Sequence, residues 1–327
     1  MLQENQKFGC LQTFLQYCPQ NVVNLQLQLS KNKLNKKKII DLSNRLSSCK
    51  SLTCLNLNLY SNKIRSQGLA FLGNSFANCQ NLKHLNLNLF DNYIDKIGMI
   101  GLGIGLGNSL NLKTLQIDLN FIGQQGLSNL FNGLQNTKTL TNLELQIVGS
   151  KILQQGASEI GSGIGRCSSL KNISLYLRSN EIGSLGVSDL CFGLGQIINL
   201  SSLTLSLSQN NIDDQGIFGL CNGLQPIQNL VSLDIILNKN QIGQVGLLSI
   251  GEGFKRFKNL KILQIDLRDN NIVHQGIQNL FRELRNYQNL VKLELLLNRT
   301  KINVKAQKKL LNIIHKFKRL VINKLLF

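Results

Sequence analysis

A leucine that recurs at a nearly constant interval constrains this chain more than any other feature. Successive leading leucines lie 30 residues apart, with a single step of 28 residues between Leu112 and Leu140. They are Leu52, Leu82, Leu112, Leu140, Leu170, Leu200, Leu230, Leu260, Leu290 and Leu320. A fixed period of about 20–50 residues is typical of a solenoid, in which each unit buries its apolar face only against its neighbours.

Each period begins with a strand pattern. In one unit Leu85, Leu87 and Leu89 alternate with polar residues, and this period of two predicts a short strand buried on one face. The same unit continues through Asn92 to Gly98, which gives the motif L-x-x-L-x-L-x-L-x-x-N-x-I-x-x-x-G.

After the glycine the period changes to that of a helix. Steps of three and four residues predict one apolar helical stripe, for example Ile217, Leu220, Leu224 and Ile227. Glycines recur beside this stripe, and we expect them to allow close helix packing despite their low helix propensity. They include Gly103, Gly105, Gly133, Gly163, Gly193, Gly223 and Gly253.

This pattern resembles the leucine-rich repeat of the ribonuclease-inhibitor-like class, which has a full helix in every unit. The resemblance covers roughly residues 22–327, and the unit from Leu112 to Gly126 matches the class without adjustment. The other units carry two extra residues, and their Asn- and Lys-rich, Pro-poor sequences are similar to ciliate repeat proteins. The resemblance implies an α/β horseshoe with parallel strands on the concave face and helices on the convex face.

We therefore interpret residues 1–327 as a single leucine-rich-repeat domain. Residues 1–21 form an N-terminal helical cap, with Leu11, Phe14, Leu15 and Cys18 covering the first strand. Residues 22–300 form about ten repeats of 28–30 residues, and residues 301–327 form a basic C-terminal helix and cap.

An asparagine occupies the same position in most units, with Ser150 and Thr300 as departures. The column consists of Asn32, Asn62, Asn92, Asn120, Asn180, Asn210, Asn240 and Asn270. Its repetition before a buried isoleucine favours a structural role, in which the side chain satisfies backbone groups where the strand turns away.

The repeat register leaves little room for chemistry. Cys49, Cys79 and Cys167 occupy the last inward position of the helix, which Ile and Phe fill in other units, so we expect them to pack in the core. The sequence shows no zinc spacing, nucleophile–base pair or phosphate-binding loop. We predict no catalytic residues, metal or cofactor, no small-molecule substrate, and a protein that is not an enzyme.

The outward row of the strands is the candidate binding surface. None of the twenty positions in its first two columns is Lys or Arg, although the chain carries 36 basic against 17 acidic residues. Five are acidic: Asp118, Glu144, Asp234, Asp266 and Glu294. A neutral-to-acidic face suits a partner with basic residues, although a simply solvated polar face explains the same pattern.

Aromatic and arginine side chains are enriched at protein interfaces, and several stand in this outward row. We expect Tyr60, Phe90, Tyr176, Arg178 and Arg268 to anchor a partner. The acids Asp118, Glu144, Asp234 and Asp266 would select its basic residues.

Basic residues gather instead at the two ends. The C-terminal group that we consider for docking to an anionic surface consists of Lys305, Lys308, Lys309, Lys316, Lys318 and Arg319. A solubilising role explains such a charge run equally simply. Nucleic acid is a weaker prediction, because no stacking aromatics or RNA-binding motif accompany the charges.

The sequence thus predicts a protein-interaction module or scaffold subunit, within a larger assembly, whose concave strands hold a protein partner. A GTPase regulator is the alternative, since Ran GTPase-activating proteins share this architecture, although they end in an acidic tail. No signal peptide and no apolar stretch of about 18 residues is found, so we expect no membrane insertion. We predict a cytoplasmic location, with cytoskeletal or ciliary placement as narrower options.

Overall fold

A strand followed by a helix recurs along the chain in the computed structural model, which describes residues 5–284, 287, 289–300 and 321–326. Contacts divide the chain into two units, which we describe separately. The first unit is Met1–Ser150 with Cys167–Leu170, and the second is Lys151–Arg166 with Lys171–Phe327. The predicted C-terminal helix falls within residues 301–320, which lie outside the described residues.

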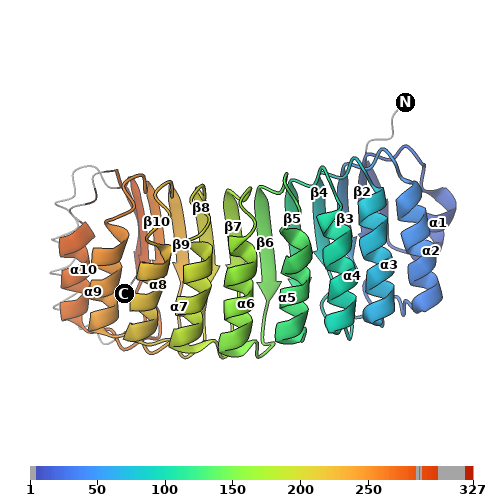
Figure 1. Cartoon of the computed structure of the whole chain (residues 1–327). Helices are drawn as coiled ribbons and strands as arrows, with labels where there is room; N and C mark the ends of the chain where they lie inside the picture. Colours follow the sequence, from blue (N-terminus) through green and yellow to red (C-terminus); the bar gives the residue numbers. More distant parts are fainter. Residues whose placement is uncertain (1–4, 285–286, 288, 301–320, 327) are drawn as a thin grey trace. The chain divides into compact units, whose positions relative to one another are not determined.

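The first unit is an ordered alternation of strands and helices (Figure 1). Its strands are β1 (Asn5–Phe8), β2 (Asn24–Gln28), β3 (Cys54–Asn58), β4 (His84–Asn88), β5 (Thr114–Leu119) and β6 (Asn142–Ile147). Its helices are α1 (Leu11–Tyr17), α2 (Lys36–Ser48), α3 (Arg65–Asn78), α4 (Lys96–Gly107) and α5 (Gly123–Leu134).

The second unit repeats the same alternation. Its strands are β7 (Asn172–Tyr176), β8 (Ser202–Ser206), β9 (Ser232–Ile236), β10 (Ile262–Asp266), β11 (Lys292–Leu296) and β12 (Val321–Leu326). Its described helices are α6 (Leu153–Gly165), α7 (Gly183–Leu194), α8 (Asp214–Leu224), α9 (Gln244–Phe254) and α10 (His274–Leu284).

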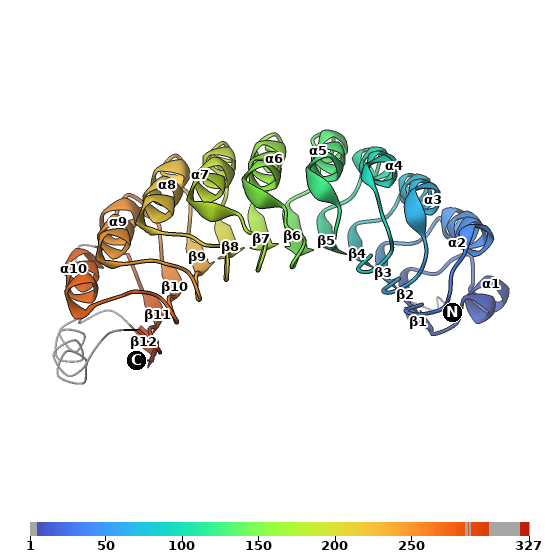
Figure 2. The same cartoon turned by 90° about the horizontal axis from the view of Figure 1, so that it is seen from below.

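Within each unit, neighbouring strands pair in parallel and in register, except that the pairing of β11 with β12 shifts between Leu293 and Glu294. Leu55 of β3 lies opposite Leu25 of β2 and Leu85 of β4, so equivalent leucines form continuous rows. Each unit has a strand layer and a helix layer (Figure 2). The leucines of the rows are buried between these layers. Parallel strands joined by helices in a stacked repeat make this an α/β leucine-rich-repeat solenoid, as the sequence predicted.

The helical stripe is buried as predicted, although each helix ends earlier than the stripe. Ile217, Leu220 and Leu224 are fully buried in α8, whereas Ile227 is equally buried but follows the last helical residue. Likewise Cys49 and Cys79 lie just beyond the ends of α2 and α3, not in the helices as expected. The last inward position therefore belongs to the turn that returns the chain to the sheet.

The N-terminal cap contains a strand that the sequence analysis missed. Helix α1 buries Leu11 and Phe14 as expected, but β1 precedes it and pairs in parallel with β2. The rings of Phe8 and Phe14 meet edge to face with centroids 5.7 Å apart, which ties β1 to α1. Because the four residues of β1 lie outside the leucine period, no repeat signal marked them.

The asparagine column is structural. In the second unit, Asn210 is fully buried and its amide donates to the carbonyl oxygens of Leu177, at 2.8 Å, and Ser208, at 3.2 Å. Its carbonyl accepts from the backbone N–H groups of Asn180, at 2.9 Å, and Ile182, at 3.3 Å. One side chain thus satisfies backbone groups of two successive repeats, which would otherwise be buried without partners.

The glycines do bring neighbouring helices into backbone contact. A Cβ built on Gly193 of α7 would lie 2.1 Å from the carbonyl carbon of Gly161 on α6. In the first unit, a Cβ on Gly105 of α4 would lie 2.1 Å from the carbonyl oxygen of Gly73 on α3. No side chain fits at these points without moving a helix, because the opposing atoms are backbone.

We predict that Asn210→Ala lowers the free energy of unfolding by about 2–4 kcal/mol, because it leaves two N–H groups and two carbonyls buried without this partner. Urea denaturation followed by circular dichroism measures the change. Asn229→Ala is the matched control, since Asn229 makes one exposed bond to the Ile198 carbonyl. An equal loss for both variants would contradict the structural role of the column.

We also predict that Gly193→Ala destabilises the protein by about 1–3 kcal/mol, although alanine is the better helix former. The added methyl group must push α7 away from α6. Ser162→Ala, an exposed position on α6, controls for helix propensity and should leave the midpoint of thermal unfolding nearly unchanged. A rise in this midpoint for Gly193→Ala would show that helix packing is looser than we describe.

Candidate interaction surface

The strand face of each unit is built from the residues that alternate with the buried leucines. Because the strands pair in register, the first outward column of the first unit runs Gln26, Asn56, Asn86, Gln116 and Glu144. In the second unit it runs Ser174, Thr204, Asp234, Gln264 and Glu294. All ten side chains are half-buried, since each is flanked by its equivalents on adjacent strands.

In the first unit the structure brings together the predicted aromatic anchors. The rings of Tyr60 and Phe90 have centroids 6.0 Å apart and are tilted by 30°. The Lys31 ammonium lies 5.7 Å from the centroid of the Tyr60 ring, a cation–π contact that the sequence analysis did not find. The three residues follow equivalent strand ends, so the pairing of β2, β3 and β4 places them side by side.

Asparagine side chains fix the backbone at both aromatic residues. The backbone N–H of Tyr60 donates to the Asn58 side chain, and that of Phe90 donates to Asn88, each at 3.0 Å. The next repeat is two residues shorter, and Asn120 accepts a hydrogen bond from the backbone N–H of Asp91 at 2.8 Å. The aromatic row therefore has no equivalent on β5.

The first unit also brings together two predicted acids. Asp118 on β5 and Glu144 on β6 are partly buried neighbours, and Gln116 donates a hydrogen bond to Glu144 at 3.1 Å. Desolvation raises the pKa of Asp118, and desolvation together with the charge of Asp118 raises the pKa of Glu144. Within the part of the chain that the structure describes, neither acid forms an ion pair, and Oδ1 of Asp118 is buried without a hydrogen-bond donor.

In the second unit the remaining predicted residues form two separate groups. Tyr176 ends β7, and Arg178, two residues later, is exposed and donates through Nε to the side-chain Oε1 of Gln209 at 2.8 Å. Asp234, Asp266 and Arg268 lie on or just after β9 and β10. Desolvation raises the pKa of Asp234, as do the charges of Glu294 and Asp266, while Lys292 opposes the shift.

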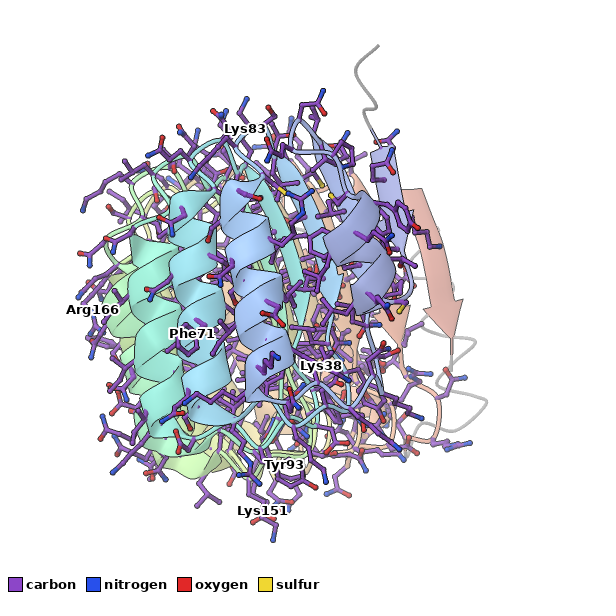
Figure 3. All side chains as sticks on the ribbon, turned by 90° about the vertical axis from the view of Figure 1, so that its right-hand side faces the viewer. Lys38, Phe71, Lys83, Tyr93, Lys151 and Arg166 are labelled. Carbon is purple, nitrogen blue, oxygen red and sulfur yellow. The ribbon has the colours of Figure 1, made fainter. Side chains whose placement is uncertain are left out.

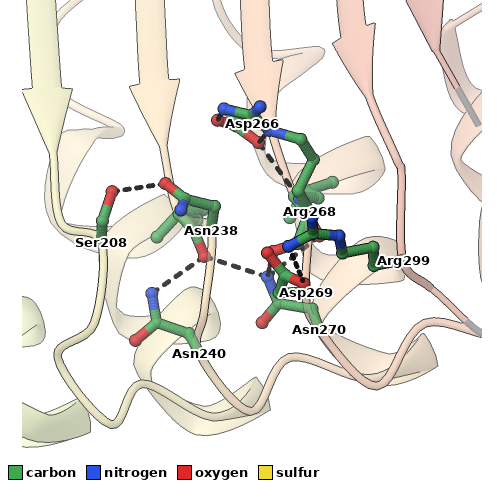
Figure 4. Close-up of polar contacts among 10 residues, drawn as sticks. Ser208, Asn238, Asn240, Asp266, Arg268, Asp269, Asn270 and Arg299 are labelled. Atoms are coloured by element: carbon green, nitrogen blue, oxygen red, sulfur yellow. Dashed lines mark hydrogen bonds and ion pairs between the residues drawn. The ribbon is translucent and has the colours of Figure 1, made fainter.

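Asp266 and Arg268 bind each other rather than standing open to a partner. Arg268 forms two parallel bonds to the Asp266 carboxylate, of 2.9 Å through Nε and 2.6 Å through a terminal nitrogen (Figure 4). The Asp266 residue is only 6% exposed and the pair raises the pKa of Arg268. The sequence placed both residues on the surface but gave no sign of this bidentate pair.

A polar network surrounds this pair. Ser208 donates to Asn238 at 2.5 Å, and Arg299 lies 3.7 Å from Asp269 (Figure 4). Below them, the side chains of Asn240 and Asn270 donate to the Leu237 carbonyl, each at 2.9 Å. This part of the strand face is therefore internally satisfied, whereas the acids of the first unit are not.

Side chains of several kinds project from the edges and from the helix layer of the first unit (Figure 3). In the first unit Lys83 projects at the edge where β4 begins and Tyr93 projects at the opposite edge, while Phe71 points outward from α3 (Figure 3). The proposed docking residues Lys305, Lys308, Lys309, Lys316, Lys318 and Arg319 lie outside the described residues.

The buried cysteines are packing residues for the most part. Burial raises the pKa of the Cys79 and Cys221 thiols to about 12, which makes them poor nucleophiles. Cys49 differs, because a hydrogen bond with Cys18 and then the charge of Arg45 lower its pKa. Cys49 is nevertheless fully buried. Among the described residues, no cluster of His, Cys, Asp and Glu could hold a metal ion, and no helix is long and apolar enough to cross a membrane.

Comparisons with known proteins add structural likeness but no family. No protein-family model matches the sequence, and no curated protein matches it either. An internalin from Listeria monocytogenes is 15% identical, with 95% of this chain and 92% of that one covered and a TM-score of 0.40. The leiomodin-1 actin-binding site 2 is 16% identical, with 40% and 71% covered and a TM-score of 0.32. Both TM-scores are below 0.5, so the fold assignment rests on the repeat geometry described above.

We predict that Asp118→Asn stabilises the protein at neutral pH. Folding raises the pKa of the Asp118 carboxyl. At pH values between its ordinary pKa and its raised pKa, the folded chain therefore binds more protons than the unfolded chain. Stability of the native protein is therefore lost as the pH rises through this window. The gain from Asp118→Asn should shrink as the pH falls and disappear below the ordinary value of 3.8.

Asp95→Asn is the control of opposite sign. Bonds from the Ser66 side chain and the backbone of Gly98 and Ile97 lower the pKa of Asp95, so its charge contributes stability above the ordinary pKa. Asp95→Asn should destabilise at neutral pH and approach the parent protein in acid. Thermal unfolding between pH 3 and pH 8 measures the change in stability for both variants. Changes of the same sign would contradict the electrostatic explanation.

Proposed function

We propose that this chain is a non-enzymatic protein-interaction module or scaffold subunit, which binds a protein partner on its strand face. The observation that carries the proposal is the pair Asp118 and Glu144, whose charges are partly desolvated and unmatched. Lysine or arginine side chains of a partner would supply the missing cations. Tyr60 and Phe90, on the same face of the first unit, offer the apolar contact area that anchors interfaces.

The free energy for such binding comes from several repeats together. Parallel strands are spaced about 5 Å apart, so each repeat adds two or three outward side chains to a continuous surface. The described acids and aromatics of the first unit lie on β5 and β6 and at the ends of β3 and β4. A partner surface rich in basic and apolar residues would fit this arrangement.

In the second unit Tyr176, Arg178 and Asp234 are the corresponding candidates. Asp266 and Arg268 contribute less in this proposal, because their charges neutralise each other. The leiomodin-1 segment is an actin-binding site, and we do not transfer actin as a partner to this chain. Membership of the ribonuclease-inhibitor-like class, a ciliate origin, a cytoplasmic location and a place in a larger assembly belong to the same proposal.

The test is affinity capture from an extract of the source cells at physiological salt, followed by mass spectrometry. A partner that depends on the strand face should be lost with Asp118→Asn/Glu144→Gln and with Tyr60→Ala/Phe90→Ala. For the purified partner, we expect each double variant to weaken the Kd by about tenfold or more. Binding should also weaken with rising salt.

Two further variants decide between surfaces. Tyr176→Ala/Arg178→Ala tests the second unit's strand face by the same readout. Lys31→Gln removes the cation beside Tyr60 without changing the acids. If every strand-face variant retains the partner while neutralisation of Lys305, Lys308, Lys309, Lys316, Lys318 and Arg319 removes it, the strand-face proposal is wrong and the basic end is the binding region.

A further inference from the structure

The helix layer of the second unit carries an apolar groove between α7 and α8. Leu185 and Phe192 of α7 are 68% and 69% exposed, and Phe218 of α8 is 54% exposed. These three side chains border a hollow of about 480 Å³. Single exposed apolar residues are ordinary, but large ones gathered around one hollow indicate an interaction site.

Small residues form the floor of this groove. A Cβ built on Gly219 would lie 2.6 Å from the Ser188 Cβ, and one built on Gly223 would lie 2.6 Å from the backbone nitrogen of Phe192. The two helices therefore pack at backbone distance here. The floor of the groove is therefore made of small residues and its rim of large apolar ones.

The stretch of sequence that contains α7 and α8 carries charges of one sign. No Lys, Arg or His occurs between Arg178 and Lys239, although the average density in this chain would place about seven there. The same stretch holds five acids: Glu181, Asp189, Asp213, Asp214 and Asp234. In a chain with a formal net charge of +19, this stretch is a local exception.

One of these acids, Asp213, lies directly beside the groove, and a second, Asp189, lies on α7 on the side that faces α6. Ser184, which lines it, donates to the Asp213 carboxylate at 2.5 Å. This bond, with the backbone bonds of the α8 N-terminus, lowers the pKa of Asp213, so its carboxylate stays ionised near neutral pH. Asp189 of α7 follows Ser188 and is reached by the Gln154 amide at 3.3 Å.

We propose that this groove binds a cationic amphipathic α-helix of a partner protein. Leu185 and Phe192 stand seven residues apart on α7, two helical turns or about 10 Å. That spacing fits apolar residues at positions i, i+4 and i+7 of a partner helix, with Phe218 packing from the other side. Lysine or arginine residues on the flanks of the partner helix would lie near Asp189 and Asp213.

The proposal goes beyond the strand-face function, because it uses the opposite layer of the second unit. No anchor residue is shared between the two surfaces. The chain could accordingly hold a helix on one layer and a protein surface on the other, as a scaffold subunit would.

The experiment uses the full chain and a fluorescent 18-residue peptide, with Leu at the i, i+4, i+7 positions of one face and Lys elsewhere. A second peptide carries Glu in place of each Lys. Fluorescence anisotropy should show saturable binding of the Lys peptide, at least tenfold tighter than the Glu peptide and weakened by salt. Phe192→Ser/Phe218→Ser should weaken it by tenfold or more, and Asp189→Lys should weaken it as well.

Controls separate this result from general adsorption. Tyr93→Ser/Phe121→Ser removes two aromatics of the first unit that are 72% and 71% exposed, and it should leave the Kd unchanged. All four phenylalanine and tyrosine positions are more than half exposed, so circular dichroism should show the parental fold. Tyr60→Ala/Phe90→Ala should also leave peptide binding intact, which distinguishes this groove from the strand face.

Three outcomes would overturn the proposal. Equal binding of the Lys and Glu peptides would remove the electrostatic basis, and equal loss in the control variants would show adsorption without a site. The third is a dimer of the peptide-free chain, seen by sedimentation and dissolved by Phe192→Ser/Phe218→Ser. It would assign the groove to a second copy of the chain instead of a partner helix.

Discussion

The buried asparagine column is the interaction on which the rest of each unit depends. A strand that ends inside a stack of repeats exposes carbonyl and N–H groups that neither the sheet nor water can satisfy. Asn62, Asn92, Asn210, Asn240 and Asn270 donate to carbonyls of their own strand end or the preceding one. Because one amide joins two repeats, each repeat completes the structure of its neighbour, and a repeat in isolation would leave these groups unsatisfied.

The stacking of the repeats also determines where the outward side chains of the strand face lie. Parallel register carries each outward residue into line with its equivalents, so Asn86, Gln116 and Glu144 form a hydrogen-bonded row with distances of 2.9 Å and 3.1 Å. The same register puts two acids on adjacent strands of the first unit. A packed core thus imposes partial desolvation on surface charges, and that desolvation makes the acids of the first unit receptive to cations.

The two proposed surfaces rely on different physical properties. On the strand face the outward side chains are half-buried, largely polar and bonded to one another, so electrostatic complementarity would dominate recognition. On the helix layer, Leu185, Phe192 and Phe218 project into solvent over a floor of small residues, so burial of apolar area would dominate. The first two outward columns of the strand face and the stretch between Arg178 and Lys239 both lack Lys and Arg, which is consistent with cationic partners at each surface.

Much of the fold could be predicted because the period repeats a local rule many times. The leucine alternation predicted the strands, the stripe after the glycine predicted the helices, and the column predicted the structural asparagines, since each depends on neighbours at a fixed sequence distance. Strand β1 escaped prediction because it lies outside the period and gains its stability from pairing with β2 and from the contact between Phe8 and Phe14. The early helix ends escaped because a turn can bury Ile227 and Cys79 as well as a helix can.

For the candidate sites, the sequence by itself determined which residues stand on the strand face and that none of the first two columns is basic. Only the tertiary structure decided which contacts these residues make. The rings of Tyr60 and Phe90 lie together, with Lys31 beside Tyr60. Asp118 and Glu144 have no ion-pair partner among the described residues, whereas Asp266 is paired with Arg268. It also revealed the groove, because Leu185 and Phe218 are 33 residues apart and become neighbours only when α7 packs on α8. Periodicity assigns a side chain to a face, whereas its partners and its solvation depend on rotamers and on distances between separate helices and strands.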